Sequence, residues 1–157
     1  MRLESPEYRD GETIPVRFAA LGVTGGTGVS APFEWYDAPP ATRSFVLALI
    51  DIHPVARGWV HWLVTDVPAR TSGLVEGASL TAEVPCGAVE HPNSGGRLGY
   101  GGPQPPVGSG VHDYVANLYA LDVPQVASGA NDEWDGVQAA MAGHVLAHAT
   151  LVGRFGR

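Results

Sequence analysis

Residues 99–114 combine side chains and backbone that suit ligand binding. The stretch holds five glycines and three prolines, and it ends at His112 and Tyr114. Glycine lets backbone N–H groups approach a ligand closely, and proline fixes the bends around it. An imidazole and a phenol beside such a loop can both form hydrogen bonds with a ligand. The pattern therefore predicts a binding loop.

A second group of polar residues lies near the middle of the chain, where Asp51 and His53 are followed by Trp59 and His61. Asp51 ends an apolar segment, so its carboxylate can either cap a turn or face a ligand. Trp59 and His61 are two residues apart, which places both on one face of a β-strand. A lone histidine on a strand is more often a core residue than a ligand contact. Whether His61 lies beside Asp51 depends on strand register, which the sequence leaves open.

Four segments predict β-strands, because each is rich in β-branched or aromatic residues between turn signals: residues 14–20, 44–51, 59–66 and 112–122. The second is apolar on both faces, so we expect both faces of its sheet to be covered. In the fourth, alternation places His112 and Tyr114 on one face and Asp113 on the other. Residues 72–96 predict a loop with one or two short strands.

One segment predicts a helix, residues 131–142. Acidic residues near its start complement the helix dipole, and Val137, Ala140 and Met141 have helical spacing. Gly143 is a suitable stop, and residues 146–153 predict a final strand. The expected fold class is therefore mostly β, with a short C-terminal helical element followed by a strand.

Length and charge limit the classes of function. The 157 residues predict a single domain over 1–157, and the net charge of −7 with scattered basic residues disfavours nucleic acid as a partner. The longest apolar run, residues 45–50, is too short to span a membrane, and the N-terminus has no signal-peptide core. Cys86 is the single cysteine, which fits a reducing compartment. We therefore expect a cytoplasmic protein.

Several short motifs occur along nearly the whole chain in a specific order. They are Ser5-Pro6, Ser30-Ala31-Pro32-Phe33-Glu34-Trp35, Asp51-x-His53-Pro54, Gly58-Trp59-Val60-His61-Trp62, Gly99-Tyr100-Gly101-Gly102-Pro103-x-Pro105-Pro106 and Gly108-x-Gly110-x-His112-x-Tyr114. In order and spacing the chain resembles the phosphatidylethanolamine-binding protein family, and within it the bacterial and archaeal Raf kinase inhibitor-like branch.

This resemblance implies a central antiparallel sheet with a second, smaller sheet packed on it. It also implies one pocket for small anions such as phosphate or phosphoethanolamine head groups, without a cofactor. By position, the pocket residues would be Asp51, Trp59, His61, Tyr100, Gly102, Pro105, Pro106, His112 and Tyr114. The resemblance also implies that the protein regulates or inhibits a kinase or protease. Because bacterial members of the family are often dimeric, it further implies a homodimer.

Two positions depart from the family pattern. The family usually has Asp-Pro-Asp-Ala-Pro where this chain has Asp51-Ile52-His53-Pro54-Val55, so His53 replaces an acid. The usual His-Arg-Tyr is His112-Asp113-Tyr114, and alternation turns Asp113 away from the pocket. We expect His53 to contact the ligand. An imidazole repels anions less than a carboxylate does, and it should make ligand binding sensitive to pH near about 6.5.

A non-enzymatic anion-binding protein is the leading hypothesis, and an enzyme is the alternative. Asp51, His53, His61 and His112 together offer the oxygen and nitrogen ligands that zinc accepts, although no local metal-binding spacing supports them. A hydrolase is a further alternative, but Ser109 lacks the Gly-x-Ser-x-Gly context of a nucleophile.

Overall fold

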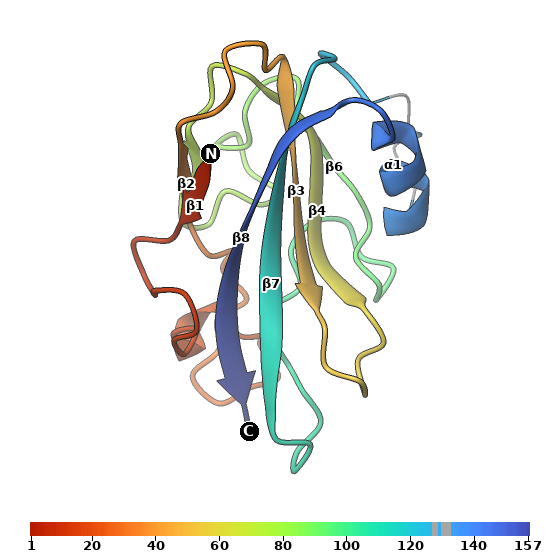
Figure 1. Ribbon diagram of the computed structural model, residues 1–157. Helices are drawn as coiled ribbons and strands as arrows, with labels where there is room; N and C mark the ends of the chain where they lie inside the picture. The colour runs from red at the N-terminus through yellow and green to blue at the C-terminus, as the bar shows by residue number, and fades with distance from the viewer. Residues whose placement is uncertain (127–128, 130–132) are drawn as a thin grey trace.

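Two antiparallel sheets share one face-to-face interface in this computed structural model, which describes residues 1–126, 129 and 133–157 (Figure 1). The large sheet has the order β6-β4-β3-β7-β8 and the small sheet the order β1-β2-β5. The strands of the large sheet are β3 (Ser44–Asp51), β4 (Trp59–Pro68), β6 (Val89–Glu90), β7 (Val111–Leu121) and β8 (Val145–Gly156). Those of the small sheet are β1 (Arg2–Glu4), β2 (Phe33–Tyr36) and β5 (Gly73–Leu74). The mostly β fold class is confirmed.

Strand β3 lies at the centre of the large sheet, and every one of its residues is buried. One face, which includes Leu47 and Leu49, packs against the small sheet in the main core. The other, which includes Val46 and Ala48, packs against helix α1 (Trp134–Met141) through Val137 and Met141. The prediction that both faces are covered is confirmed, because a central strand between two layers needs apolar side chains on each side.

The alternation predicted for β7 is also confirmed. His112, Tyr114, Ala116 and Leu118 are buried on the face of the main core. Asp113 lies on the opposite face and forms an ion pair with Arg154 of β8, with 3.0 Å between Asp113 Oδ1 and Arg154 Nε. The two short strands expected within residues 72–96 are β5 and β6.

The strand predicted for residues 14–20 is wrong. Residues 16–18 form a short 3-10 helix, η1 (Val16–Phe18), which follows Pro15. Pro15 has no N–H for a strand ladder, and its carbonyl accepts the Phe18 N–H at 3.0 Å, which closes a turn. The apolar spacing that resembled a strand instead buries Phe18 completely while Val16 is 46% exposed.

Helix α1 begins at Trp134, with Glu133 as its N-cap residue; residues 131 and 132 of the predicted helix lie outside the described part of the chain. It ends at Met141, just before Gly143, whose φ of 82° favours glycine and explains the stop. Strand β8 then extends beyond the predicted 146–153 at both ends. In the described part of the chain, no helix has the length and apolar character that a membrane crossing requires.

Replacing Leu47 by alanine tests the two-sided burial of β3. Leu47 is fully buried, so we expect the substitution to lower the free energy of unfolding by about 2–5 kcal/mol. Leu21→Ala is the matched control: Leu21 is 80% exposed, and its loss should change this free energy by less than about 0.5 kcal/mol. Urea unfolding measures both, and equal effects would contradict the assignment of the core.

Candidate functional site

Asp51 is the last residue of β3, and strand register places it between two other site residues. It pairs with Trp59 at the start of β4 and with Tyr114 on β7. Since side chains on a strand alternate, Asp51 lies on the same face as Leu47 and Leu49, the face of the main core. A carboxylate thus lies at the end of an apolar core, and it is only 3% exposed.

A β-bulge in β4 brings His61 to the same site. Leu49 pairs with Trp62 whereas Ile50 pairs with Val60, so His61 is an extra residue without a partner on β3. A bulge of this kind re-aims the side chains beside it. The His61 ring contacts Tyr114 edge-on at 5.1 Å between centroids, while its neighbour Trp62 is buried in the same core. The register question that the sequence left open is therefore answered by the bulge.

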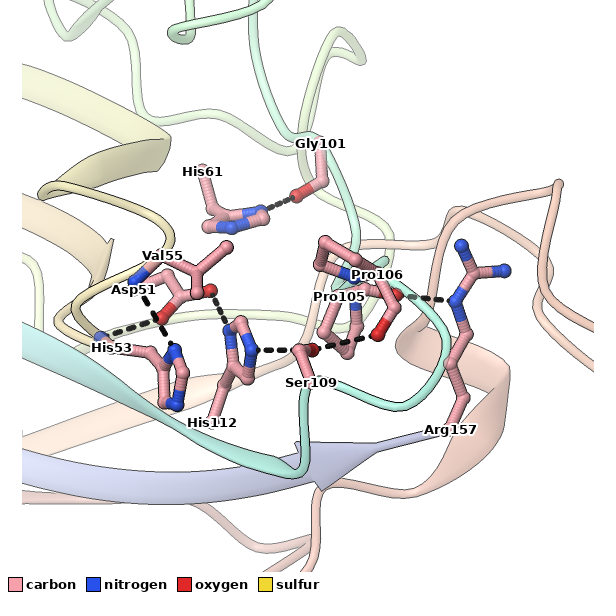
Figure 2. A network of polar contacts seen from close by, with 10 residues as sticks. All are labelled: Asp51, His53, Val55, His61, Gly101, Pro105, Pro106, Ser109, His112 and Arg157. Atoms are coloured by element: carbon pink, nitrogen blue, oxygen red, sulfur yellow. Dashed lines mark hydrogen bonds and ion pairs between the residues drawn. The ribbon is translucent and has the colours of Figure 1, made fainter.

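The glycine- and proline-rich loop is held against these strands on several sides. The Gly101 N–H donates to the His61 carbonyl at 2.7 Å, and the Tyr100 hydroxyl donates to the Phe18 carbonyl at 2.7 Å. The Ala20 N–H donates to the Pro103 carbonyl at 3.1 Å. Near the end of the chain, the Arg157 guanidinium donates to the Pro105 carbonyl (Figure 2). These contacts order the loop before any ligand binds, so a ligand does not bear that entropy cost.

The strands and the loop enclose a cavity of about 480 Å³. Its wall includes all the predicted site residues except His53 and Tyr100, namely Asp51, Trp59, His61, Gly102, Pro105, Pro106, His112 and Tyr114. Tyr100 lies behind the loop, where it packs on Trp62 and bonds to Phe18. Gly102 is needed for packing as well, because a Cβ there would lie 2.5 Å from the backbone of residues 18–20.

Asp51, His112 and Ser109 form a chain of short hydrogen bonds (Figure 2). His112 Nδ1 lies 2.6 Å from Asp51 Oδ2, and His112 Nε2 lies 2.9 Å from Ser109 Oγ. Ser109 Oγ is also 2.6 Å from the Pro106 carbonyl oxygen, and two oxygens this close need a proton between them, which the serine hydroxyl supplies. The Ser109 oxygen therefore accepts the Nε2–H of His112.

Both ring nitrogens of His112 are thus engaged, Nδ1 by the Asp51 carboxyl group and Nε2 by Ser109, and the two residues form an ion pair when the ring is protonated. Both groups are almost completely buried, with exposed fractions of 1% and 3%. The other carboxylate oxygen accepts the His53 N–H at 2.9 Å. Charge compensation and hydrogen bonding together make this buried pair stable, and they leave no net charge on Asp51 and His112 taken together.

His53 supports this pair rather than lining the cavity. Its ring stacks on His112 with 3.8 Å between centroids and 11° between planes. Its Nδ1 accepts the Val55 N–H at 3.3 Å, so the turn after β3 fixes the ring from the other side. The residue that replaces the family's second acid thus adds no negative charge to the cavity, and it acts through His112.

His61 and Tyr114 present free polar atoms. The Nδ1–H of His61 donates to the Gly101 carbonyl at 2.6 Å (Figure 2), while its Nε2 forms no hydrogen bond with the residues that the structure describes. Burial lowers the pKa of His61, against a smaller opposing effect of the Gly101 carbonyl, so the ring is neutral at pH 7. The fully buried Tyr114 hydroxyl makes no hydrogen bond of normal length. Burial and then the nearby Asp51 charge raise the pKa of Tyr114, so it remains a hydrogen-bond donor.

The alternatives of a hydrolase and of a zinc site concern particular side chains at the cavity. In the part of the chain that the structure describes, no serine, threonine or cysteine lines it, and the Ser109 hydroxyl is committed to Pro106. Across residues 1–126, 129 and 133–157, no group of three or more histidine, cysteine or acidic side chains is arranged to hold a metal ion.

Several cavity residues were not singled out by the sequence. Arg97 and Asn93 come from the turn after β6, and Gln104 from the variable position of the glycine- and proline-rich motif. Val55 and Ala56 come from the turn between β3 and β4. No local pattern distinguishes these residues from ordinary turn residues, since their position on the cavity depends on contacts between distant segments.

Two packed antiparallel sheets with a cavity at the Asp51 end of the central strand define the structural class of this protein. The family model described as phosphatidylethanolamine-binding protein matches residues 4–156, and the chain belongs to this family. It is 37% identical to a UPF0098 protein of Methanothermobacter thermautotrophicus, over 100% of this chain and 99% of the relative. It is 34% identical to the UPF0098 protein YbhB of Escherichia coli, over 99% of each chain.

Solved structures agree with this assignment. The crystal structure of Escherichia coli YbcL, described as a new member of the mammalian PEBP family, superposes with a TM-score of 0.91 and 27% identity over 99% of this chain and 98% of YbcL. The PEBP homologue CT736 of Chlamydia trachomatis gives a TM-score of 0.84 and 31% identity, over 99% of this chain and 97% of CT736. A relative from Mycobacterium tuberculosis, LppC, is named a lipoprotein, so a cytoplasmic location stays a prediction.

A double-mutant cycle tests the Asp51–His112 pair. Asp51→Ala and His112→Ala should each lower the free energy of unfolding by about 3–5 kcal/mol, because either one leaves its partner without charge compensation in the interior. The free energy of unfolding of the double variant should be little lower than that of either single variant. Asp113→Ala, which breaks the exposed pair with Arg154, is the control and should cost less than about 1 kcal/mol. Additive losses at Asp51 and His112 would contradict the coupling.

Proposed function

We propose that this protein binds a small anionic group of the phosphate or phosphoethanolamine type in the cavity beside Asp51 and His112. The observation that carries the proposal is the Tyr114 hydroxyl, a fully buried donor that lies beside the Asp51 carboxylate but forms no hydrogen bond of normal length with any described residue. Burying such a donor costs about 1–3 kcal/mol unless it is satisfied. A ligand oxygen in the cavity would satisfy it.

Further donors line the same cavity. The Gly102 N–H takes part in no hydrogen bond among the described residues, and Gly102 lies on the cavity wall. Arg97 adds a cationic side chain at the wall, and His61 adds a second donor when its Nε2 is protonated. A protein of net charge −7 can thus attract an anion locally, because hydrogen-bond donors and one unpaired cation act at short range.

The residues around the cavity support ligand binding rather than catalysis. Both nitrogens of His112 are engaged in hydrogen bonds with Asp51 and Ser109, so the ring helps to shape the cavity and has no free nitrogen for proton transfer to a ligand. Trp59, 44% exposed on the cavity wall, can cover the carbon chain of a ligand. No feature of the described residues specifies a kinase or protease as a partner, so the proposal concerns the small anion alone.

Titration with phosphoethanolamine and with inorganic phosphate tests the proposal. We expect the histidine ring signals of His61 and His112 to shift in NMR spectra at millimolar ligand, because both rings line the cavity. The exposed ring of His144, which pairs with Asp122 outside the cavity, should not move. Tyr114→Phe removes the buried donor without changing the ring and should weaken binding about ten-fold. Unmoved His61 and His112 signals for both ligands would sink the proposal.

The affinity should depend on pH through His61. Burial lowers the pKa of His61 in the free protein, and a bound anion favours the protonated ring, so affinity should rise as the pH falls below about 6.5. Ethanolamine O-sulfate is a suitable probe, since its charge does not change in this range. The limiting slope is about ten-fold per pH unit for one proton. His61→Asn should flatten this dependence, whereas equal affinity from pH 5 to 8 in the unmodified protein would contradict a role for the cationic ring.

A further inference from the structure

The ionic groups on the cavity wall are unevenly balanced. Asp51 is the single acid among the described wall residues, and its charge is compensated by His112. His53, in place of a second acid, stacks behind His112. Arg97 is the one arginine or lysine on that wall, and it forms no ion pair with any described residue. The cavity therefore has an uncompensated positive charge at Arg97 and no uncompensated carboxylate.

The backbone that carries Arg97 is fixed. Asn93 is 8% exposed, and its Oδ1 accepts the N–H groups of Gly95 and Arg97 at 2.9 and 3.3 Å. The Asn93 N–H donates to the Arg97 carbonyl at 2.8 Å. The turn is also tied to β4, since Ser94 Oγ accepts the Val60 N–H at 2.9 Å and the Ser94 N–H donates to the Val60 carbonyl at 3.0 Å. A turn held in this way keeps the base of the Arg97 side chain at the cavity.

The charges on the cavity wall should discriminate between two kinds of phosphate monoester, those with an ammonium group and those with a carboxylate beside the phosphate. An ammonium group beside the phosphate, as in phosphoethanolamine, finds no free carboxylate in the cavity. A carboxylate beside the phosphate finds the Arg97 guanidinium, whose planar donors match the two oxygens of a carboxylate. The Tyr114 hydroxyl and the Gly102 N–H remain available to the phosphate group.

We propose that Arg97 selects ligands that carry a carboxylate beside the phosphate group, so that the preferred ligand class is a small phosphate monoester of a hydroxy acid. This inference rests on the proposed function, because it assigns the second charged group of the same ligand. Arg97 is the specificity-determining residue, and Asn93 is its positioning residue.

Calorimetric titration with O-phospho-L-serine and with phosphoethanolamine tests this selection, because the two ligands differ by one carboxylate. At constant ionic strength, the unmodified protein should bind O-phospho-L-serine about five-fold more tightly or better. 2-Phosphoglycolate, which has the phosphate and the carboxylate without an amine, should bind at least as tightly as O-phospho-L-serine. Arg97→Gln should bring the ratio for the first two ligands close to one, because it should weaken the binding of O-phospho-L-serine more than the binding of phosphoethanolamine.

Arg57→Gln is the matched control. Arg57 is also exposed, but it lines the neighbouring depression with Trp134 and not the cavity, so its loss should preserve the preference for O-phospho-L-serine. Equal affinity of the unmodified protein for the first two ligands, or an unchanged ratio in Arg97→Gln, would overturn the inference while leaving anion binding intact. Absence of binding by all three ligands would instead overturn the proposed function itself. Circular dichroism confirms that both variants are folded.

Discussion

The buried pair of Asp51 and His112 is the interaction on which the rest of the site depends. It joins the end of β3 to the start of β7 inside the core, with 2.6 Å between the two side chains. The turn after β3 bonds to the same carboxylate, and the loop before β7 bonds to the same imidazole through Ser109. Each charge is tolerated in the interior only because the other is present. One pair thus fixes the two segments that bound the cavity.

The glycine- and proline-rich loop is joined to the bulge at His61 by two hydrogen bonds. The Gly101 N–H and carbonyl bond to the backbone carbonyl and the ring of the same residue, His61. Beside this double contact, His61 Nε2, the Tyr114 hydroxyl and the Gly102 N–H form no hydrogen bond of normal length with the described residues, and all three residues line one cavity. The anion binding proposed above depends on these rigid surroundings, because a ligand would complete hydrogen bonds without ordering the protein.

Family membership and the individual features of this chain contribute separately to its function. The fold, the loop and most of the cavity residues match what the resemblance to phosphatidylethanolamine-binding proteins implies. His53 stands where the family pattern usually has an acid, so it adds no carboxylate beside His112, on which its ring stacks. Arg97 adds a guanidinium at the cavity wall. The ligand preference proposed above depends on this charge balance rather than on the fold.

The sequence by itself determined the features that depend on neighbouring residues. The two-sided burial of β3, the alternation of His112 against Asp113 and the stop at Gly143 follow from local composition and from the periods of strands and helices. The segment at residues 14–20 shows the limit, since Pro15 and its turn outweighed an apolar strand pattern. Tertiary structure alone decided the bulge that aims His61, the stacking of His53, the contact of His112 with Asp51 and the presence of Arg97 at the cavity. Each of these depends on register, hydrogen bonds and distances between segments far apart in the chain, which no local pattern encodes.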